Sequence, residues 1–235
     1  MTSLAIIPAR YNSSRLPGKP LVDIFGKSMI QRVYEQAKQS LADKLIVATD
    51  DYRVEAAVTA FGGQVMMTSD KHLSGTDRCA EVLDKIKEKV DVVINIQGDE
   101  PFINPSQINQ LITAFDTPTT QIATLAKQIE AQSEIEDEHT AKVQFDDNFW
   151  ATSFDRVVSY NKATTYYKHI GLYAFRPQTL LEISQLPPTD KEHQLRLEQW
   201  RWLDHQYKIK VQITSVDAYA VDTPDDLKKV IQRFG

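Results

Sequence analysis

The chain has 235 residues, of which 42% are hydrophobic and 25% charged, and this is the composition of an ordinary globular protein. A chain of this length can build its core without disulfides or a structural metal, so we expect one domain over residues 1–235. With 27 basic and 32 acidic residues the net charge is -5, and no global positive field favours nucleic acid as a partner.

The single cysteine and the N-terminal segment favour a protein of the cell interior. Cys79 has no second cysteine to pair with, which suits a reducing compartment, and we expect it to be a small packed residue. Residues 1–10 lack the basic start and the hydrophobic run of a signal peptide, and no stretch of about 20 apolar residues occurs. We therefore expect a cytoplasmic protein with no membrane partner.

Short apolar runs alternate with amphipathic segments in the first half of the chain. The amphipathic spacing predicts helices over residues 29–40, 52–61 and 76–87. The apolar runs predict strands that are buried on both faces, at residues 4–7, 45–47, 64–67 and 92–96. This alternation predicts an α/β fold with a mostly parallel sheet, whose ligand lies at the carboxyl ends of the strands.

The second half of the chain changes rhythm and predicts an inserted, partly antiparallel lobe over residues 120–205. Strands are expected at residues 122–127, 141–145, 149–154 and 169–175, with little helix between them. A capping box of Thr189 and Glu192 predicts a helix that continues to about Asp204. Asn104-Pro105 and Thr223-Pro224 carry the cap-then-proline pattern of two further helix starts.

Three cations follow the first strand, at the edge of the sheet where the ligand is expected. Arg10, Arg15 and Lys19, with the turn amides near Gly18, are groups that hold a polyphosphate. A basic solvated loop is the alternative, which the position after a buried strand disfavours. The segment has neither the Walker A pattern nor G-x-G-x-x-G, so P-loop hydrolysis and dinucleotide binding lose support.

Two acids, far apart in the chain, are candidate ligands of a divalent cation. Asp99 follows the fourth predicted strand, and Mg²⁺ in proteins takes one or two carboxylates while phosphate and water complete its shell. Asp222 precedes the last helix and is the second candidate, with helix capping as its alternative. Glu100 is expected to face away as a turn acid. We predict that Asp99 and Asp222 meet over the cationic loop and share one Mg²⁺.

Other polar residues occupy positions that are typical of binding sites. Ser74 and Arg78 lie at a helix start, where exposed amides and the guanidinium would read a base or a phosphate, although helix capping explains Ser74 equally well. His169 begins a strand, and no histidine pair has zinc-ligand spacing. Glu198 and Gln199 interrupt an apolar helix face, which indicates either a polyhydroxylated ligand or an internal hydrogen bond.

Taken together, these segments resemble the 3-deoxy-manno-octulosonate (Kdo) cytidylyltransferases over nearly the whole chain. In chain order the matching segments are Ile7-Pro8-Ala9-Arg10, Arg15-Leu16-Pro17-Gly18-Lys19-Pro20-Leu21, Val47-Ala48-Thr49-Asp50, Ser74-Gly75-Thr76, Gln97-Gly98-Asp99-Glu100-Pro101, Lys168-His169-Ile170-Gly171-Leu172-Tyr173, Leu197-Glu198-Gln199 and Val221-Asp222-Thr223-Pro224. The resemblance implies a three-layer nucleotide-diphospho-sugar transferase-like fold with a dimerisation lobe. It also implies a homodimer that converts CTP and an eight-carbon acid sugar to the CMP-sugar and pyrophosphate for lipopolysaccharide biosynthesis.

The resemblance also implies roles for individual residues. Those assigned to catalysis are Lys19, Arg15, Arg10 and Asp99. Those assigned to the nucleotide are Ala9, Arg10, Arg15, Lys19, Ser74, Arg78, Gln97 and Gly98. Those assigned to the sugar are Arg156, His169, Tyr173, Glu198 and Gln199. The Mg²⁺ cofactor is assigned to Asp99 and Asp222.

Departures from the family pattern gather around the sugar residues. Asp155-Arg156 stands where a Ser-Arg pair is usual, and residues 157–164 form a shorter loop. The carboxylate of Asp155 would attract an ammonium group, so the substrate is either Kdo or its derivative with an amino group at C8, while loop drift without a change in specificity is the alternative. Another sugar substrate, or a regulator that binds nucleotide without catalysis, are the alternative functions.

Overall fold

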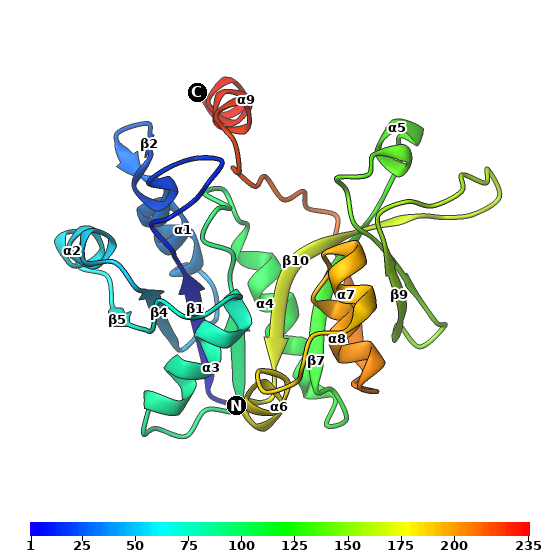
Figure 1. Cartoon of the computed structure of the whole chain (residues 1–235), viewed down its shortest axis with the longest axis horizontal. Helices are drawn as coiled ribbons and strands as arrows, with labels where there is room; N and C mark the ends of the chain where they lie inside the picture. Colours follow the sequence, from blue (N-terminus) through cyan, green and yellow to red (C-terminus); the bar gives the residue numbers. More distant parts are fainter.

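A computed structural model describes the whole chain, residues 1–235, and is built around one nine-stranded sheet (Figure 1). Along the sheet the strands lie in the order β11-β7-β10-β6-β1-β4-β5, with β8 and β9 attached to β10. Their bounds are β1 (Ser3–Pro8), β4 (Lys44–Thr49), β5 (Val65–Met67), β6 (Val92–Asn95), β7 (Ile122–Gln128), β8 (Lys142–Phe145), β9 (Ala151–Asp155), β10 (Tyr167–Phe175) and β11 (Ile209–Ile213).

The first half of the sheet is parallel, as the alternation of strands and helices predicts. Strand β1 lies between β4 and β6 and pairs in parallel with both, and β4 pairs in parallel with β5. Strand β10 is antiparallel to both β6 and β7, and the edge strand β11 returns parallel to β7. The prediction of a mixed α/β fold with a mostly parallel sheet is therefore confirmed.

Helices cover both faces of this sheet and give three layers. One core cluster contains buried residues of α1 (Met29–Ala37), α2 (Tyr52–Ala60) and α4 (Pro105–Thr113). The other contains residues of α3 (Gly75–Lys85), α6 (Pro177–Ile183) and α8 (Gln199–Asp204), among them the fully buried Cys79. The other short elements are η1 (Lys19–Leu21), β2 (Asp23–Ile24), β3 (Lys27–Ser28), η2 (Ala114–Asp116) and α5 (Gln132–Glu136), and the chain closes with α9 (Pro224–Phe234). No helix has the length and apolar character that crossing a bilayer requires.

The continuous helix expected from Thr189 to about Asp204 is wrong, because the chain breaks there into α7 (Asp190–Leu195) and α8. The capping box of Thr189 and Glu192 opens α7 as predicted. Arg196 then takes a left-handed conformation with φ 54°, which ends α7 without a glycine. Glu198 consequently stands at the N-cap position of α8, without a capping hydrogen bond from its side chain, instead of lying on a stripe of one long helix.

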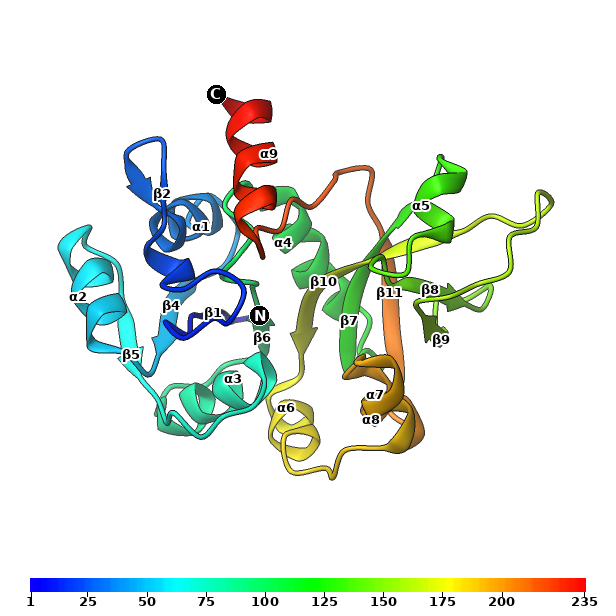
Figure 2. The same ribbon diagram turned by 45° about the horizontal axis from the view of Figure 1, so that its top comes forward.

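A lobe formed by α5, the β8–β9 hairpin and the adjoining end of β10 projects beyond the sheet (Figures 1 and 2). Strand β8 joins the main sheet through its pairing with β10 at Lys142 and Lys168, so the lobe extends the sheet. Close to this junction β10 bulges, since its register with β7 shifts between Ile170 and Tyr173. A bulge redirects side chains and carbonyl groups, and this one lies beside the candidate site.

Candidate active site

Two adjoining cavities lie at the carboxyl ends of β1 and β6. The first, of about 330 Å³, is bordered by the loop after β1, the start of α3, the loop after β6 and Asp222. The second, of about 650 Å³, is bordered by β10, the start of α8 and the lobe. The residues that border both cavities are Gly75, Gln97, Asp99 and Asp222. The two cavities therefore meet at the pair of acids.

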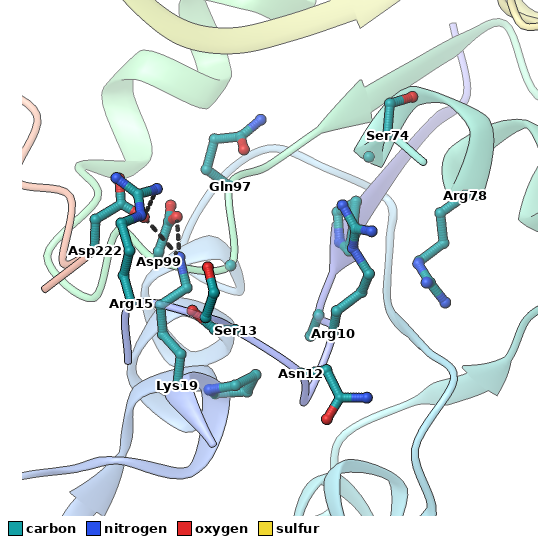
Figure 3. A pocket seen from close by; sticks show the side chains of 16 residues that line it. Arg10, Asn12, Ser13, Arg15, Lys19, Ser74, Arg78, Gln97, Asp99 and Asp222 are labelled. Atoms are coloured by element: carbon teal, nitrogen blue, oxygen red, sulfur yellow. Dashed lines mark hydrogen bonds and ion pairs between the residues drawn. The ribbon is translucent and has the colours of Figure 1, made fainter. Parts of the chain in front are cut away.

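Asp99 and Asp222 come together over the cationic loop, as the sequence predicts (Figure 3). The Lys19 Nζ lies 2.6 Å from an Asp99 carboxylate oxygen and 3.0 Å from an Asp222 carboxylate oxygen. The backbone N–H of Val221 donates to the Asp99 carbonyl at 2.8 Å, which ties the two segments together. Burial lowers the pKa of Lys19, but the two carboxylates outweigh burial and the net shift is upward, so Lys19 is a cation.

The two arginines of the same loop are more open to solvent. The Arg15 guanidinium lies 2.9 Å from Asp222, and its side chain is 63% exposed. The Arg10 guanidinium donates to the carbonyl oxygens of His72 and Leu73 at 3.2 and 2.9 Å. Both arginines and Lys19 border the first cavity, so the loop presents three cations to one space. Ala9, which is buried, and Ser74 also border that cavity.

The first cavity depends on a close approach of two loops at Gly98. A Cβ atom at this position would lie 2.6 Å from the carbonyl oxygen of Pro8, a distance that real Cβ atoms do not reach. Glycine therefore allows the loop after β6 to lie directly against the end of β1. This contact sets Gln97 and Asp99 beside the cationic loop.

Arg78 is the most deeply buried of the cations at the first cavity. It borders the first cavity, but its side chain is fully buried, and the guanidinium donates to Thr68 and, at 3.0 Å, to Asp50. Its charged end also points away from the Lys19 cluster (Figure 3). Its Nε has no partner within the protein, so a role of Arg78 in holding the nucleotide stays a prediction. Ser74 forms the capping box of that helix with Asp77.

The residues predicted to hold the sugar all border the second cavity: Arg156, His169, Tyr173, Glu198 and Gln199. The amide nitrogen of Gln199 and the hydroxyl of Tyr173 are hydrogen-bonded to each other. Glu198 accepts a hydrogen bond at 2.8 Å from Thr76. Burial raises the pKa of Glu198 and lowers the pKa of His169 to about 3, so His169 is neutral.

Arg156 uses its donors on the protein itself. Its three guanidinium nitrogens donate to the carbonyl oxygens of Leu195, His139 and Arg196, at 2.9, 3.0 and 3.4 Å. Arg156 therefore joins the lobe to the break between α7 and α8, just before Glu198. Arg156 also borders the second cavity, and its expected role in binding the sugar stays a prediction.

Buried oxygen atoms without a partner gather around the second cavity. They belong to Asn95, Glu100, Glu198 and Gln199, all of which border it. A buried acceptor that lacks a donor is unfavourable by about 1–3 kcal/mol, so the oxygens of Asn95, Glu198 and Gln199 would suit a ligand that supplies hydrogen-bond donors. The expectation that Glu100 faces away is wrong, since it is buried at the cavity, where burial and then Asp99 raise its pKa to about 8. Sequence reasoning missed Asn95, whose one signal is an amide side chain in an apolar strand.

The residues around Asp99 and Asp222 fit a hard divalent cation. The chain has no group of three or more acidic, histidine or cysteine side chains that would hold a metal alone. Two carboxylates that converge on one positive charge beside a cationic cavity are the donor set that Mg²⁺ uses when phosphate oxygens and water provide its remaining ligands.

Comparison with known proteins gives the family. A cytidylyltransferase family model matches residues 4–210. The chain is 51% identical to the 3-deoxy-manno-octulosonate cytidylyltransferase of Parabacteroides distasonis, over 98% of this chain and 97% of that protein. It is also 51% identical to the enzyme of the same name from Bacteroides thetaiotaomicron, over 97% of this chain and 96% of that protein.

Solved structures agree. The structure of CMP:2-keto-3-deoxy-manno-octonic acid synthetase complexed with CTP superposes with a TM-score of 0.94 at 42% identity, covering 99% of this chain and 98% of that one. A putative glucose-1-phosphate thymidylyltransferase from Bacillus anthracis, with a TM-score of 0.72 at 17% identity over 99% of this chain and 95% of that one, shares the fold. The chain therefore belongs to the 3-deoxy-manno-octulosonate cytidylyltransferase family and is a CTP-dependent nucleotidyltransferase.

Proposed function

We propose that the protein transfers the cytidylyl group of CTP to Kdo, giving CMP-Kdo and pyrophosphate for lipopolysaccharide biosynthesis. The observation that carries this proposal is the junction of two unlike cavities at Asp99 and Asp222. One cavity presents three cations, which suits a triphosphate, and the other presents unpartnered oxygens, which suits a polyhydroxylated sugar. The names of the relatives and the CTP bound in the related structure support the same reading.

In the first cavity, Lys19, Arg15 and Arg10 would hold the triphosphate by charge-assisted hydrogen bonds. Asp99 and Asp222 would hold Mg²⁺, which when bound neutralises phosphate charge. With the cation held there, the two carboxylates would give up their present contacts with Lys19, whose ammonium would then be available to a phosphate oxygen. Arg15 and Asp222 exchange partners in the same way.

In the second cavity, the sugar would lie with its anomeric C2 hydroxyl toward the junction of the cavities. The hydroxyl oxygen forms a bond to the α-phosphorus while the bond from that phosphorus to pyrophosphate breaks, and the hydroxyl proton is released. This transfer depends on alignment and on charge stabilisation. Gln97 and Asp99 border both cavities, so the reacting groups meet beside them.

The derivative of Kdo with an amino group at C8 is the finer alternative for the substrate. Asp155, the carboxylate expected to attract its ammonium, accepts a hydrogen bond from Ser153 at 2.7 Å and does not border the second cavity. Glu134, which does border it, is 2.8 Å from Lys168 and already paired. Asp155, on which the amino-sugar reading depends, is thus not placed to bind that ammonium, and we propose unmodified Kdo as the substrate.

We also propose that the protein is a homodimer joined through the lobe. Phe149, Val157 and Tyr160 are large side chains that the single chain leaves exposed there, and a second copy would cover them. Equilibrium sedimentation of the wild-type protein should give twice the mass of one chain. Replacement of Phe149 by Asp should then shift that mass toward one chain, and an unchanged mass would contradict this interface.

The enzymatic proposal is tested by measuring pyrophosphate release with CTP, Mg²⁺ and a panel of acid sugars. Kdo, 8-amino-Kdo and a nine-carbon acid sugar are compared at matched concentrations by kcat/KM. We expect the highest value for Kdo. A higher value for the amino sugar would overturn the choice of substrate, and CTP binding without pyrophosphate release from any sugar would favour a regulator.

A further inference from the structure

The hydroxyl of Thr124 lies at the bulge of β10, in contact with one of the sugar-site residues. Thr124 is on β7 and its side chain is fully buried. Its Oγ1 lies 2.8 Å from the carbonyl oxygen of Leu172, 3.2 Å from that of Ile170 and 2.9 Å from Nε2 of His169. The register shift between Ile170 and Tyr173 directs both carbonyls at the one hydroxyl.

The Thr124 hydroxyl has one proton for three neighbours, and this determines which ring nitrogen of His169 is protonated. A threonine hydroxyl has a single proton, and a carbonyl oxygen only accepts, so the hydroxyl donates toward Leu172 or Ile170. The remaining contact of Oγ1 is His169 Nε2, which must then donate. With an unprotonated Nε2, the hydroxyl would have to turn its proton to the ring and leave its oxygen facing two carbonyl oxygens.

We propose that Thr124 holds His169 in the tautomer with the proton on Nε2, so that His169 enters the sugar site as a hydrogen-bond acceptor through Nδ1. Nδ1 makes no hydrogen bond with the protein, and His169 borders the second cavity. The low pKa of His169 keeps the ring neutral, so Nδ1 stays unprotonated near neutral pH. Thr124 is thus a positioning residue for the sugar site.

In this tautomer His169 presents a hydrogen-bond acceptor to the second cavity, as other polar groups there do. The unpartnered buried oxygens of Glu198 and Gln199 are also acceptors. The group that approaches Nδ1 is therefore a donor, and on an acid sugar the donors are its hydroxyls. The inference rests on the proposed function for the identity of the ligand, but the tautomer itself is a property of the free protein.

The test compares Thr124→Val with Thr124→Ser and with the matched control Thr120→Val. Thr120 is also fully buried, but its hydroxyl has no partner and does not contact His169. The tautomer of His169 is measured by nitrogen-15 NMR of the free protein, and the KM values for CTP and for Kdo are measured separately.

We expect the Nε2-protonated tautomer in the wild type, in Thr124→Ser and in Thr120→Val, and a loss of that preference in Thr124→Val. We expect the KM for Kdo to rise about tenfold in Thr124→Val alone, with the KM for CTP unchanged. An Nδ1-protonated ring in the wild type, or an unchanged KM for Kdo in a folded Thr124→Val, would overturn the inference. Should Thr124→Val not fold, the wild-type and serine spectra decide. A wild-type enzyme inactive with Kdo but with the expected tautomer would instead refute the proposed function.

Discussion

The two cavities differ in how far the protein satisfies its own polar groups. In the first, Lys19 binds Asp99 and Asp222, and Arg15 also binds Asp222, so the charges are paired within the protein. In the second, buried oxygens of Glu198 and Gln199 have no donor. Under the proposed function, the first cavity would receive its ligand by exchanging ion pairs, whereas the second would receive its ligand by completing hydrogen bonds.

This difference indicates where affinity and specificity arise. Exchange of ion pairs depends on charge more than on the position of single ligand groups. This suits a triphosphate, which many nucleotides share. Unpartnered acceptors penalise every ligand that lacks a donor at the matching place, which suits the selection of one sugar. Substitutions in the two cavities should therefore have separable effects.

The largest effect is expected from the shared acids. Replacement of Asp222 by Asn should lower kcat by on the order of 100-fold or more, because a charge stabiliser at the junction of the cavities is lost. Asp225→Asn is the matched control, since Asp225 belongs to the same helix start and is 78% exposed. Pyrophosphate release is measured for both variants. Near-normal turnover in Asp222→Asn would refute the role of that carboxylate.

A smaller effect, confined to the sugar, is expected at Gln199. Gln199→Leu removes an unpartnered acceptor and the hydrogen bond to Tyr173, and should raise the KM for the acid sugar about 10-fold to 100-fold. The KM for CTP should change little. Gln110→Leu is the control, because Gln110 also has an unpartnered buried oxygen but borders neither cavity. Equal changes in the KM for the acid sugar and the KM for CTP in Gln199→Leu would contradict separate roles for the two cavities.

Glu100 should make stability depend on pH. Its pKa is raised to about 8 from an ordinary value of 4.5, so between these values the folded protein binds a proton that the unfolded chain releases. The free energy of unfolding should therefore fall as pH rises from 4.5 toward 8, by at most about 1.4 kcal/mol per pH unit. Urea unfolding at several pH values should show a weaker decline in Glu100→Gln. An identical decline in the variant and the wild type would exclude Glu100 as its source.

The smallest effect is expected from the C-terminal helix, which supports Asp222 from a distance. The Phe234 ring stacks on Phe102, with centroids 4.0 Å apart, and so connects the end of α9 to the loop that carries Asp99. Phe234→Ala should lower kcat/KM for CTP about twofold to tenfold, because an aromatic pair contributes about 0.5–1.5 kcal/mol. Ile231→Ala, at another exposed position of the same helix, should have less effect. Equal kcat/KM values for Phe234→Ala and Ile231→Ala would show that the stacked pair of Phe234 and Phe102 does not support the site.

Much of the fold could be predicted because local patterns carry it. Buried strands and amphipathic helices alternate through the first half of the chain, and that order implies a parallel sheet. Strand β11 and helix α6 were not predicted, and the break at Arg196 has no glycine or proline to mark it. The strand β11 alternates apolar and polar residues and α6 begins with a proline, so both carry local signals that the prediction did not use, whereas the break at Arg196 carries none.

The site was predictable in its composition but not in its contacts. The sequence indicates Asp99 because it follows a strand, Lys19 because it lies in the loop after the first strand, and Asp222 because it precedes the last helix. It could not show that Arg78 donates to Asp50 or Arg156 to Leu195, since these partners are distant in the chain. The sequence likewise could not show that Asp99 contacts Lys19 while its neighbour Glu100 is buried.

The most direct test of the account is a crystal structure of the protein with CTP and Mg²⁺. We predict one cation that contacts both Asp99 and Asp222, with Lys19 moved onto the triphosphate. A cation bound by the phosphates alone, with both carboxylates still on Lys19, would contradict the exchange of ion pairs on which the account depends.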